Sequence, residues 1–428
     1  MADSAELNLL DELYLHLNRD DEPWSVHLEV QAEGSIDPAR LEDAVRAAAL
    51  RHPIARARLA PTRATDVRYR WEIADELEDV PLEVTGEDAA GARERLLSAL
   101  PALDRPGPFT LGLVRGADGD SLILNLVHAA GDGMAALRLM ASILRAYSGQ
   151  DDPAPAVDPL AVRDIKALVG SQSIAERLKR SRAAVGYMMR GLTPPVRVAP
   201  DGASDRPGYG FELLELEPDE VKQVSAQRTG GATVNDVLLG ALGVTIGRWN
   251  ERHGETSGTA YLMMPINLRP PEWRFDVVGN FASYVSVHLG ADEQVDMESA
   301  VAAAAERTRR IKDDGVAGLI VDLFEIPTAM PTALKRRLQQ LIPLTNNLVV
   351  DTAVLSNLGK LEDVPDLGDA GRVRAVWFSP PGRMPLGVSL GAASLDGRLF
   401  LTLRYRHPQF GPEAAAEFAA LYRRTLLG

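Results

Sequence analysis

The sequence predicts an α/β fold in which mixed β-sheets are flanked by helices. Short apolar runs typical of buried strands alternate along the chain with segments whose apolar residues recur at helical spacing. The chain has 428 residues, of which 46% are hydrophobic. This length exceeds that of most domains with a single hydrophobic core. We therefore expect two tightly joined halves, residues 1–190 and 210–428, joined by a proline- and glycine-rich linker at residues 191–209.

Hydrophobic spacing predicts the elements of the N-terminal half in order. They are a helix at 8–18, a strand at 25–31, a helix at 38–51 that Asp37 caps, a strand at 122–127, a helix that begins near Gly133, and a helical stretch at 160–191. A connector at 148–158, rich in proline, aspartate and glycine, separates the last two.

The C-terminal half combines two helices with several strands. The predicted elements are a strand at 210–216, a helix at 217–227, a core helix at 233–249, and strands at 260–266, 283–289, 349–356, 385–394 and 398–405. Both halves thus predict the same layered arrangement of helices on sheets.

Composition excludes several classes of function. The net charge of −14 and the pI near 5.1 argue against nucleic-acid binding, which needs a dominant basic surface. Because the chain has no cysteine, disulfides, thiolate nucleophiles and cysteine-based metal sites are excluded. The N-terminus lacks the pattern of a signal peptide, and no run of about eighteen apolar residues predicts a transmembrane segment. We expect a cytoplasmic protein.

Cofactor motifs are also missing from the sequence. The seven histidines are scattered, with no H-E-x-x-H pattern, so no metal site is expected. No G-x-S-x-G elbow, phosphate-binding P-loop or dinucleotide-binding G-x-G-x-x-G occurs where it would be needed. Any catalysis is therefore expected to need no permanently bound cofactor.

The most informative segment is residues 121–133. His128 follows the apolar strand, and Asp132 and Gly133 come next, which gives the pattern H-x-x-x-D-G. Such a corner can present an imidazole to a cleft, where it can take a proton from a hydroxyl or amine that attacks a carbonyl. Asp132 either caps the following helix or pairs with a distant cation. The alternative for His128 is a hydrogen-bonded structural residue, and the motif alone leaves both roles open.

The order of several such motifs resembles the chloramphenicol-acetyltransferase-like superfamily. This superfamily includes nonribosomal-peptide condensation domains, polyketide-associated acyltransferases and wax ester synthase/diacylglycerol acyltransferases. The matching positions are residues 9–17, residues 41–56, His128 with Asp132 and Gly133, Asn235 and Asp236 within residues 233–242, residues 265–270, Gly279-Asn280-Phe281 and Ser356-Asn357-Leu358-Gly359. The resemblance runs nearly from end to end of the chain.

The resemblance implies two chloramphenicol-acetyltransferase-like halves with an active-site tunnel at their interface. His128 would be the general base for direct acyl transfer, without a covalent acyl-enzyme. Asp132 would be structural, paired with an arginine whose matching position is Arg269. Ser356, Asn357 and backbone amides near Gly133 are candidates for stabilising the oxyanion. The first histidine of the family's H-H-x-x-x-D-G signature is Val127 here, which changes the neighbourhood of the base without removing it.

Donor, acceptor and partners stay open at this point. Coenzyme A and the phosphopantetheine arm of a carrier protein present the same thioester as substrate, so the motif does not distinguish them. Basic clusters at 177–190, 307–312 and 335–337 could attract coenzyme A phosphates or an acidic carrier protein, although such clusters are often solvated helix faces. Residues 177–190 could also form an amphipathic helix that touches a membrane or bridges the halves.

Three functions remain open for a chain that we expect to be monomeric. The first is an acyltransferase or condensation enzyme of natural-product biosynthesis, which joins an acyl thioester to a small-molecule alcohol or amine. The second is a lipid-forming wax ester synthase/diacylglycerol acyltransferase. The third is a non-catalytic member that binds a carrier protein or acts as a scaffold.

Overall fold

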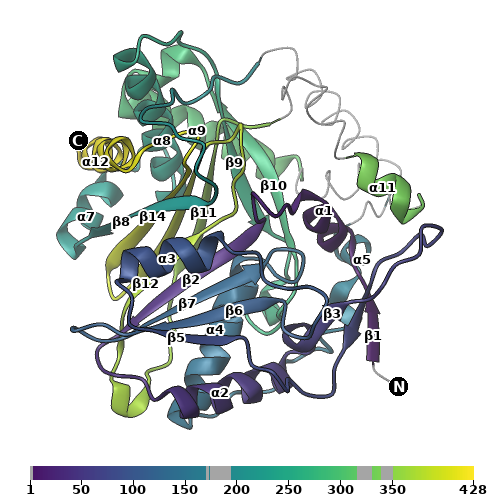
Figure 1. Cartoon of the computed structure of the whole chain (residues 1–428). Coiled ribbons are helices and arrows are strands. Elements are labelled where there is room, and N and C mark those ends of the chain that lie inside the picture. The colour runs from purple at the N-terminus through teal and green to yellow at the C-terminus, as the bar shows by residue number, and fades with distance from the viewer. Residues whose placement is uncertain (1–2, 170–172, 174–193, 316–329, 339–349) are drawn as a thin grey trace.

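The computed structural model describes residues 3–169, 173, 194–315, 330–338 and 350–428, and its ribbon is a two-lobed α/β fold (Figure 1). The first lobe is built on a five-stranded sheet with the strand order β12-β2-β7-β6-β5. Its strands are β2 (Ser25–Ala32), β5 (Leu82–Thr85), β6 (Phe109–Val114), β7 (Ser121–Val127) and β12 (Val373–Ser379). All neighbours pair antiparallel except β5 and β6, so the sheet is mixed.

The second lobe contains a six-stranded sheet with the order β10-β9-β11-β13-β14-β8. Its strands are β8 (Tyr209–Leu216), β9 (Ala260–Asn267), β10 (Ala282–Leu289), β11 (Ala353–Lys360), β13 (Val388–Leu395) and β14 (Arg398–Arg406). Strand β11 runs parallel to both of its neighbours, and the other pairs are antiparallel. A third, three-stranded sheet joins β1 (Asp3–Glu6), β4 (Arg70–Ile73) and β3 (Ala57–Leu59).

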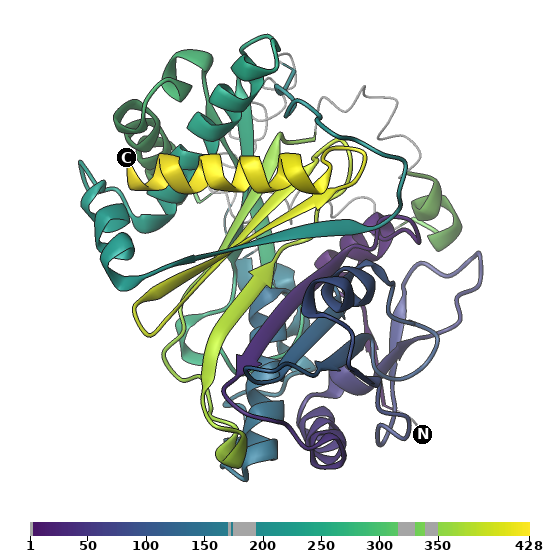
Figure 2. The ribbon, with the colours of Figure 1, turned by 60° about the vertical axis from the view of Figure 1, so that its left-hand side comes forward.

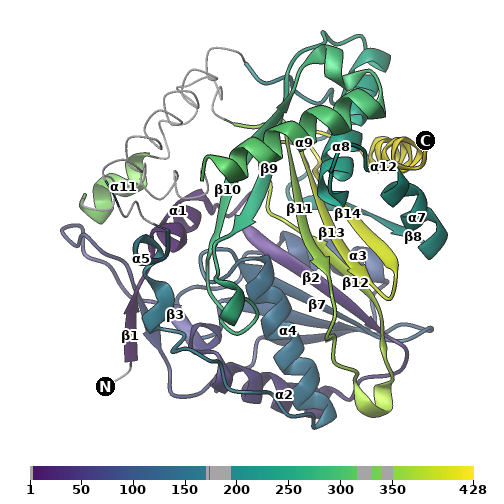
Figure 3. The ribbon, with the colours of Figure 1, turned by 180° about the vertical axis from the view of Figure 1, so that it is seen from behind.

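Helices cover the faces of both large sheets. In the first lobe, α3 (Ala89–Ser98) covers one face, and α4 (Gly133–Ser148), which packs on α2 (Pro38–Arg51), covers the other (Figures 1 and 3). The helices of the second lobe are α7 (Pro218–Ala226), α8 (Val234–Arg252), α9 (Met297–Asp313) and α12 (Pro412–Leu427). Helices α8 and α9 pack together on the second sheet, and α12 packs against α8. The predicted α/β class with helix-flanked mixed sheets is therefore confirmed.

Strand β12 connects the two lobes. It lies in the second half of the sequence, yet it pairs with β2 at the edge of the first sheet, with Val376 opposite Val30 (Figure 2). It also packs on the second sheet, where the rings of Trp377 and Phe400 form a T-shaped pair with 4.9 Å between their centroids. The hydrophobic core of the first lobe consequently includes Phe400. The sequence did not predict this strand, and residues 210–428 complete the sheet of residues 1–190.

Three short helices lie near the junction of the lobes: α1 (Leu9–Leu17), α5 (Ile165–Val169) and α11 (Thr332–Leu338). Helix α1 was predicted at 8–18, and Asn8 and Asp11 close its N-terminus in a capping box. Residues 160–169 of the helical stretch predicted at 160–191 are described, with a 3-10 helix at Ala161–Arg163 and α5 at Ile165–Val169. Apart from Ser173, residues 170–191 lie outside the described part of the chain. No helix in the described part of the chain is long and apolar enough to cross a membrane.

Candidate active site

His128 lies in the turn between β7 and α4, as the hydrophobic pattern predicted. Strand β7 is buried along its whole length because it lies in the interior of the first sheet. The backbone N–H of His128 donates to the carbonyl oxygen of Trp24 at 3.0 Å, which ties the turn to the chain entering β2. The His128 residue is 7% exposed, so its imidazole lies in a largely water-free environment.

Two side chains from distant parts of the sequence hold His128. The ring of Tyr14, in α1, stacks on the imidazole with 3.9 Å between centroids and 20° between planes. The side-chain amide of Asn280, just before β10, donates a hydrogen bond to the carbonyl oxygen of His128. Asn280 was predicted only as part of a second-half motif, and the structure brings it into direct contact with the candidate base.

Burial lowers the pKa of His128 to about 4, and the positive charge of Arg404 acts in the same direction. The negative charge of Asp132 and the backbone oxygens of His128 and Gly131 oppose this shift. The imidazole is therefore neutral at pH 7 and has a lone pair available to accept a proton.

The predicted ion pair between the two halves is present. The Nη1 of Arg269, just after β9, lies 2.7 Å from Oδ2 of Asp132, and both side chains are buried. Arg269 also donates to the carbonyl oxygens of Val277 and Gly279, and its guanidinium lies over the ring of Phe281 at 4.5 Å. Because Asp132 compensates the charge and both Nη atoms of Arg269 have hydrogen-bond acceptors, the pair can exist in a buried site.

Gly133, the first residue of α4, is in a close approach between elements. A Cβ atom at this position would meet Cδ2 of Leu358 and Cε2 of Phe378, each at 2.9 Å. Leu358 belongs to β11 and Phe378 to β12, so the start of α4 packs directly on strands from the second half of the sequence. Glycine at this position lets the motif corner contact the opposite lobe.

The oxyanion candidates lie in β11 next to Leu358. Ser356 is buried, and Asn357 is half-buried with its side-chain oxygen accepting from the N–H of Gly359 at 2.8 Å. The contact between Leu358 and Gly133 brings this segment to the corner that carries His128. The role of both residues at an oxyanion stays a prediction.

Asn235 and Asp236 stabilise the N-terminus of α8. Asp236 forms a capping box with Thr233 and accepts a hydrogen bond from Thr308 of α9 at 2.7 Å. The amide of Asn235 donates to the sulfur of Met264 in β9 at 3.0 Å. These contacts fix the N-terminus of helix α8 against β9 and α9.

The sequence reasoning missed two residues that shape the site, Tyr14 and Arg404. Arg404 in β14 is buried and donates to the carbonyl oxygens of Pro23 and Ser25, on either side of Trp24. Its guanidinium also lies 3.7 Å from the ring centroid of Tyr209. A lone aromatic residue among the leucines of α1 was the signal for Tyr14, but no local pattern points to Arg404.

Some residues of the basic clusters form ion pairs where the structure describes them, among them Arg310 with Glu306 at 2.6 Å. Arg307 pairs with Glu293 at 2.9 Å, and the buried Lys335 pairs with Glu12 at 2.6 Å. The cluster at 177–190 lies outside the described residues. Across the part of the chain that is described, no group of three or more histidine, aspartate or glutamate side chains could hold a metal ion.

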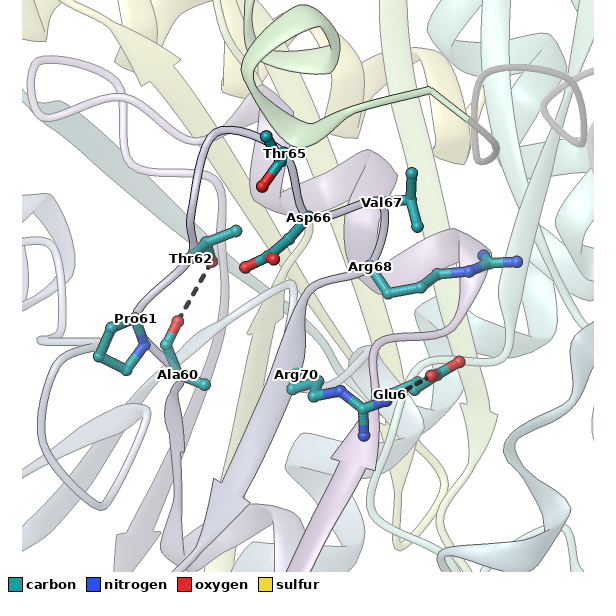
Figure 4. A pocket seen from close by; sticks show the side chains of 9 residues that line it. All are labelled: Glu6, Ala60, Pro61, Thr62, Thr65, Asp66, Val67, Arg68 and Arg70. Carbon is teal, nitrogen blue, oxygen red and sulfur yellow. Dashed lines mark hydrogen bonds and ion pairs between the residues drawn. The ribbon is translucent and has the colours of Figure 1, made fainter.

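The structure also has a hollow of about 460 Å³, whose lining residues are drawn in Figure 4. It is lined by Glu6 of β1, by residues 60–62 and 65–68 of the connection between β3 and β4, and by Arg70 at the start of β4. Arg70 and Glu6 form an exposed ion pair at 2.8 Å across it. None of the residues that line this hollow belongs to the motif corner or its partners.

Comparison with known proteins identifies the family. The sequence model of the Condensation domain matches residues 13–322, which is most of the chain and includes the motif corner. The chain belongs to the condensation-domain family. This condensation-domain chain is also 39% identical, over 100% of both chains, to the uncharacterized protein Rv2305 of Mycobacterium tuberculosis.

Two further similarities extend over part or all of the condensation-domain chain. A putative diacylglycerol O-acyltransferase of M. tuberculosis is 30% identical over 268 residues, covering 55% of each chain. The first condensation domain of the calcium-dependent antibiotic synthetase, solved with a substrate analogue, superposes with a TM-score of 0.73. That match covers 100% of this chain and 96% of the domain at 15% sequence identity, so it supports the fold.

Proposed function

We propose that this protein transfers an acyl group from a thioester donor to an alcohol or amine, with His128 as the general base. The observation that carries the proposal is the environment of His128. Its imidazole is neutral, largely excluded from water and held at the junction of the lobes by Tyr14 and Asn280. A neutral imidazole fixed in such a site is suited to accept a proton from an attacking nucleophile.

The proposed reaction proceeds in one transfer. The acceptor hydroxyl or amine attacks the thioester carbonyl while His128 takes its proton, which gives a tetrahedral oxyanion and an imidazolium. Collapse of this intermediate breaks the C–S bond, and the imidazolium returns the proton to the departing thiolate. The products are an ester or amide and a free thiol. The carboxylate of Asp132 favours the transient imidazolium, since its charge raises the pKa of His128.

Donor and acceptor are proposed by class. Coenzyme A and carrier-protein phosphopantetheine thioesters are both candidate donors, because the reaction uses only their shared thioester. The match to condensation domains supports a carrier protein, and we place the reaction in the cytoplasm and in natural-product biosynthesis. We further propose that the substrates meet in a tunnel between the lobes, with Ser356 and Asn357 near the oxyanion.

A lipid-forming acyltransferase is the second candidate. Its support is the similarity to a putative diacylglycerol O-acyltransferase, which extends over 55% of the chain. An enzyme of this type would use a hydroxyl group as the acyl acceptor. This candidate predicts that long-chain acyl-CoA with a fatty alcohol or diacylglycerol is a better substrate pair than short acyl groups with small polar acceptors.

The test is release of free thiol by the full-length protein. Acyl-CoA and acyl-carrier protein should each be offered with and without alcohol and amine acceptors, and the products identified by mass spectrometry. We expect acceptor-dependent release that His128→Ala lowers by about 10²- to 10⁴-fold with little change in melting temperature. His253→Ala, at the C-terminus of α8, is the matched control and should retain activity. Release that is the same in His128→Ala contradicts the proposal, and absence of release with every donor favours a non-catalytic binding protein.

A further inference from the structure

The stacking partner of His128 comes from a helix that is itself firmly anchored. The hydroxyl of Tyr14 donates to the carbonyl oxygen of Ala282, at the start of β10, at 2.8 Å. The side chain of Asn8, which caps the same helix, donates to the carbonyl oxygen of Asn280 at 3.0 Å. Helix α1 is thus attached to the segment whose Asn280 side chain bonds His128.

Buried ion pairs also anchor α1. Asp11 pairs with Arg163, and Glu12 pairs with Lys335 of α11 at 2.6 Å. All four side chains are at most 5% exposed, so removing either partner would leave a charge without compensation. These contacts fix the helix from several directions, and the ring of Tyr14 therefore has little freedom to leave the imidazole.

We propose that Tyr14 is a positioning residue for His128: its ring fixes the plane of the imidazole and keeps water from one of its faces. This inference rests on the proposed function of His128 as a base. A neutral imidazole and a phenol ring attract each other when stacked, and a fixed imidazole plane fixes the direction of its lone pair. A small misorientation of this lone pair relative to the acceptor would lower the rate of proton transfer, because catalysis depends on the correct placement of the reacting groups.

The charges around His128 determine how its titration should respond. Asp132 at the start of α4 favours the protonated imidazole, and Arg404 of β14 disfavours it. Tyr284 of β10 lies near Tyr14, whose own pKa is raised by burial, so the phenol stays neutral. The net lowering of the pKa of His128 means that desolvation outweighs any attraction between the ring and an imidazolium. Removing the ring should therefore raise this pKa.

The first experiment follows the titration of His128 by NMR in protein labelled at the histidine Cε1, with His128→Gln to assign the signal. In Tyr14→Ala, water can reach the imidazole, and the pKa should rise from about 4 toward 6.5. Tyr14→Phe keeps the ring and should keep the pKa within about half a unit of the original protein. If Tyr14→Ala does not fold, Tyr14→Leu should give a smaller shift in the same direction.

The second experiment measures acyl transfer by the same variants. Loss of orientation should lower kcat of Tyr14→Ala by about 10- to 100-fold, while KM for the thioester changes by less than about threefold. In Tyr14→Ala, the acidic limb of the pH–rate profile should shift to higher pH by the same amount as the pKa of His128 measured by NMR. In Tyr14→Phe, both the pH–rate profile and this pKa should resemble those of the original protein. Leu10→Ala removes a buried side chain from the same helix and should lower stability while leaving the pKa of His128 unchanged.

The two experiments separate this inference from the proposed function. An unchanged titration and unchanged kcat in Tyr14→Ala, in a protein whose acyl transfer depends on His128, would overturn the role of Tyr14. A shifted titration in a protein that transfers no acyl group would instead overturn the role of His128 as a base. A shift of equal size in Leu10→Ala would reduce Tyr14 to an ordinary packing residue.

Discussion

Asp132 and Arg269 are 137 residues apart in the sequence, yet their side chains form an ion pair of 2.7 Å and are only 2% and 0% exposed. The second oxygen of the same carboxylate has a different partner. Oδ1 of Asp132 accepts from the N–H of Ala135 at 3.0 Å and so caps α4, while Oδ2 binds Arg269 and the N–H of Phe281. One carboxylate therefore caps the N-terminus of α4 and also forms the ion pair that links this helix to Arg269 of the other lobe.

Asp132→Asn should separate these two roles. Asparagine caps helices as well as aspartate does, so a cap alone would lose well under about 1 kcal/mol. Loss of the ion pair leaves Arg269 buried without a counter-charge, and the free energy of unfolding should fall by about 3–5 kcal/mol. Urea unfolding of Asp132→Asn, Arg269→Met and the double variant should give non-additive effects, because the double variant has no unpaired charge.

The matched control for this cycle is Asp37→Asn. Asp37 is an exposed cap of α2 that accepts from the N–H of Arg40 at 2.8 Å. The Asp37→Asn substitution should lower the free energy of unfolding by only a few tenths of a kcal/mol. Equal losses at Asp37 and Asp132 would mean that the ion pair adds nothing to stability.

Gly133→Ala should destabilise the junction between α4 and β11. The new methyl group would lie 2.9 Å from the side chains of Leu358 and Phe378, which must move to accept it. Such overpacking costs about 1–3 kcal/mol, and a lower melting temperature should be accompanied by a lower rate of acyl transfer. Gly86→Ala is the control, since its Cβ meets nothing within 4 Å. Equal melting temperatures for the two variants would contradict the close approach.

Val127→His, which restores the first histidine of the family signature, should also be destabilising. Val127 is 0% exposed within the core of the first lobe. Burial of a polar imidazole without a hydrogen-bond partner should lower the free energy of unfolding by about 1–3 kcal/mol. Differential scanning calorimetry would measure this loss. Val295→His, at a position 67% exposed, should change stability by less than about 0.5 kcal/mol. A Val127→His protein as stable as the original would show that the corner has room for the second ring.

Stability should fall as the pH is lowered from about 6.5 toward 4. Burial lowers the pKa of His128 to about 4 and that of His52 to about 3, and holds that of His27 well below 6.5. In this range the unfolded chain binds protons that the native protein does not, so acid favours unfolding. Each such histidine contributes up to about 1.4 kcal/mol per pH unit.

One buried carboxyl group opposes this trend. Burial raises the pKa of Asp11 to about 6, so it stabilises the native protein below its unfolded pKa of 3.8 and loses that contribution as the pH rises through 6. Urea unfolding at pH 7, 6 and 5 should still give a net decline. His52 forms a hydrogen bond with Ser142 and is not part of the motif corner. The substitution His52→Gln should therefore lower the number of protons taken up on unfolding by about one, which makes the decline in the free energy of unfolding less steep. Equal stability at pH 7 and 5 would contradict the neutral, buried state of these histidines.

The motif corner could be predicted because its pattern is local. The apolar run before His128 forms β7, and the helical spacing after Gly133 forms α4, whose end at Gly149 has a positive φ of 71°. The ion-pair partner Arg269 came from the order of motifs along the chain, since nothing local to Asp132 identifies a cation 137 residues away.

The sequence by itself determined the α/β class, the strand–turn–helix corner and the positions of His128 and Asp132, because hydrophobic periodicity and capping act over a few residues. Only the tertiary structure decided that β12 completes the first sheet, that Tyr14 stacks on His128 and that Arg404 lies near enough to influence its pKa. Strand pairing, ring stacking and desolvation depend on which distant segments meet in space. These long-range contacts make His128 a buried, neutral imidazole.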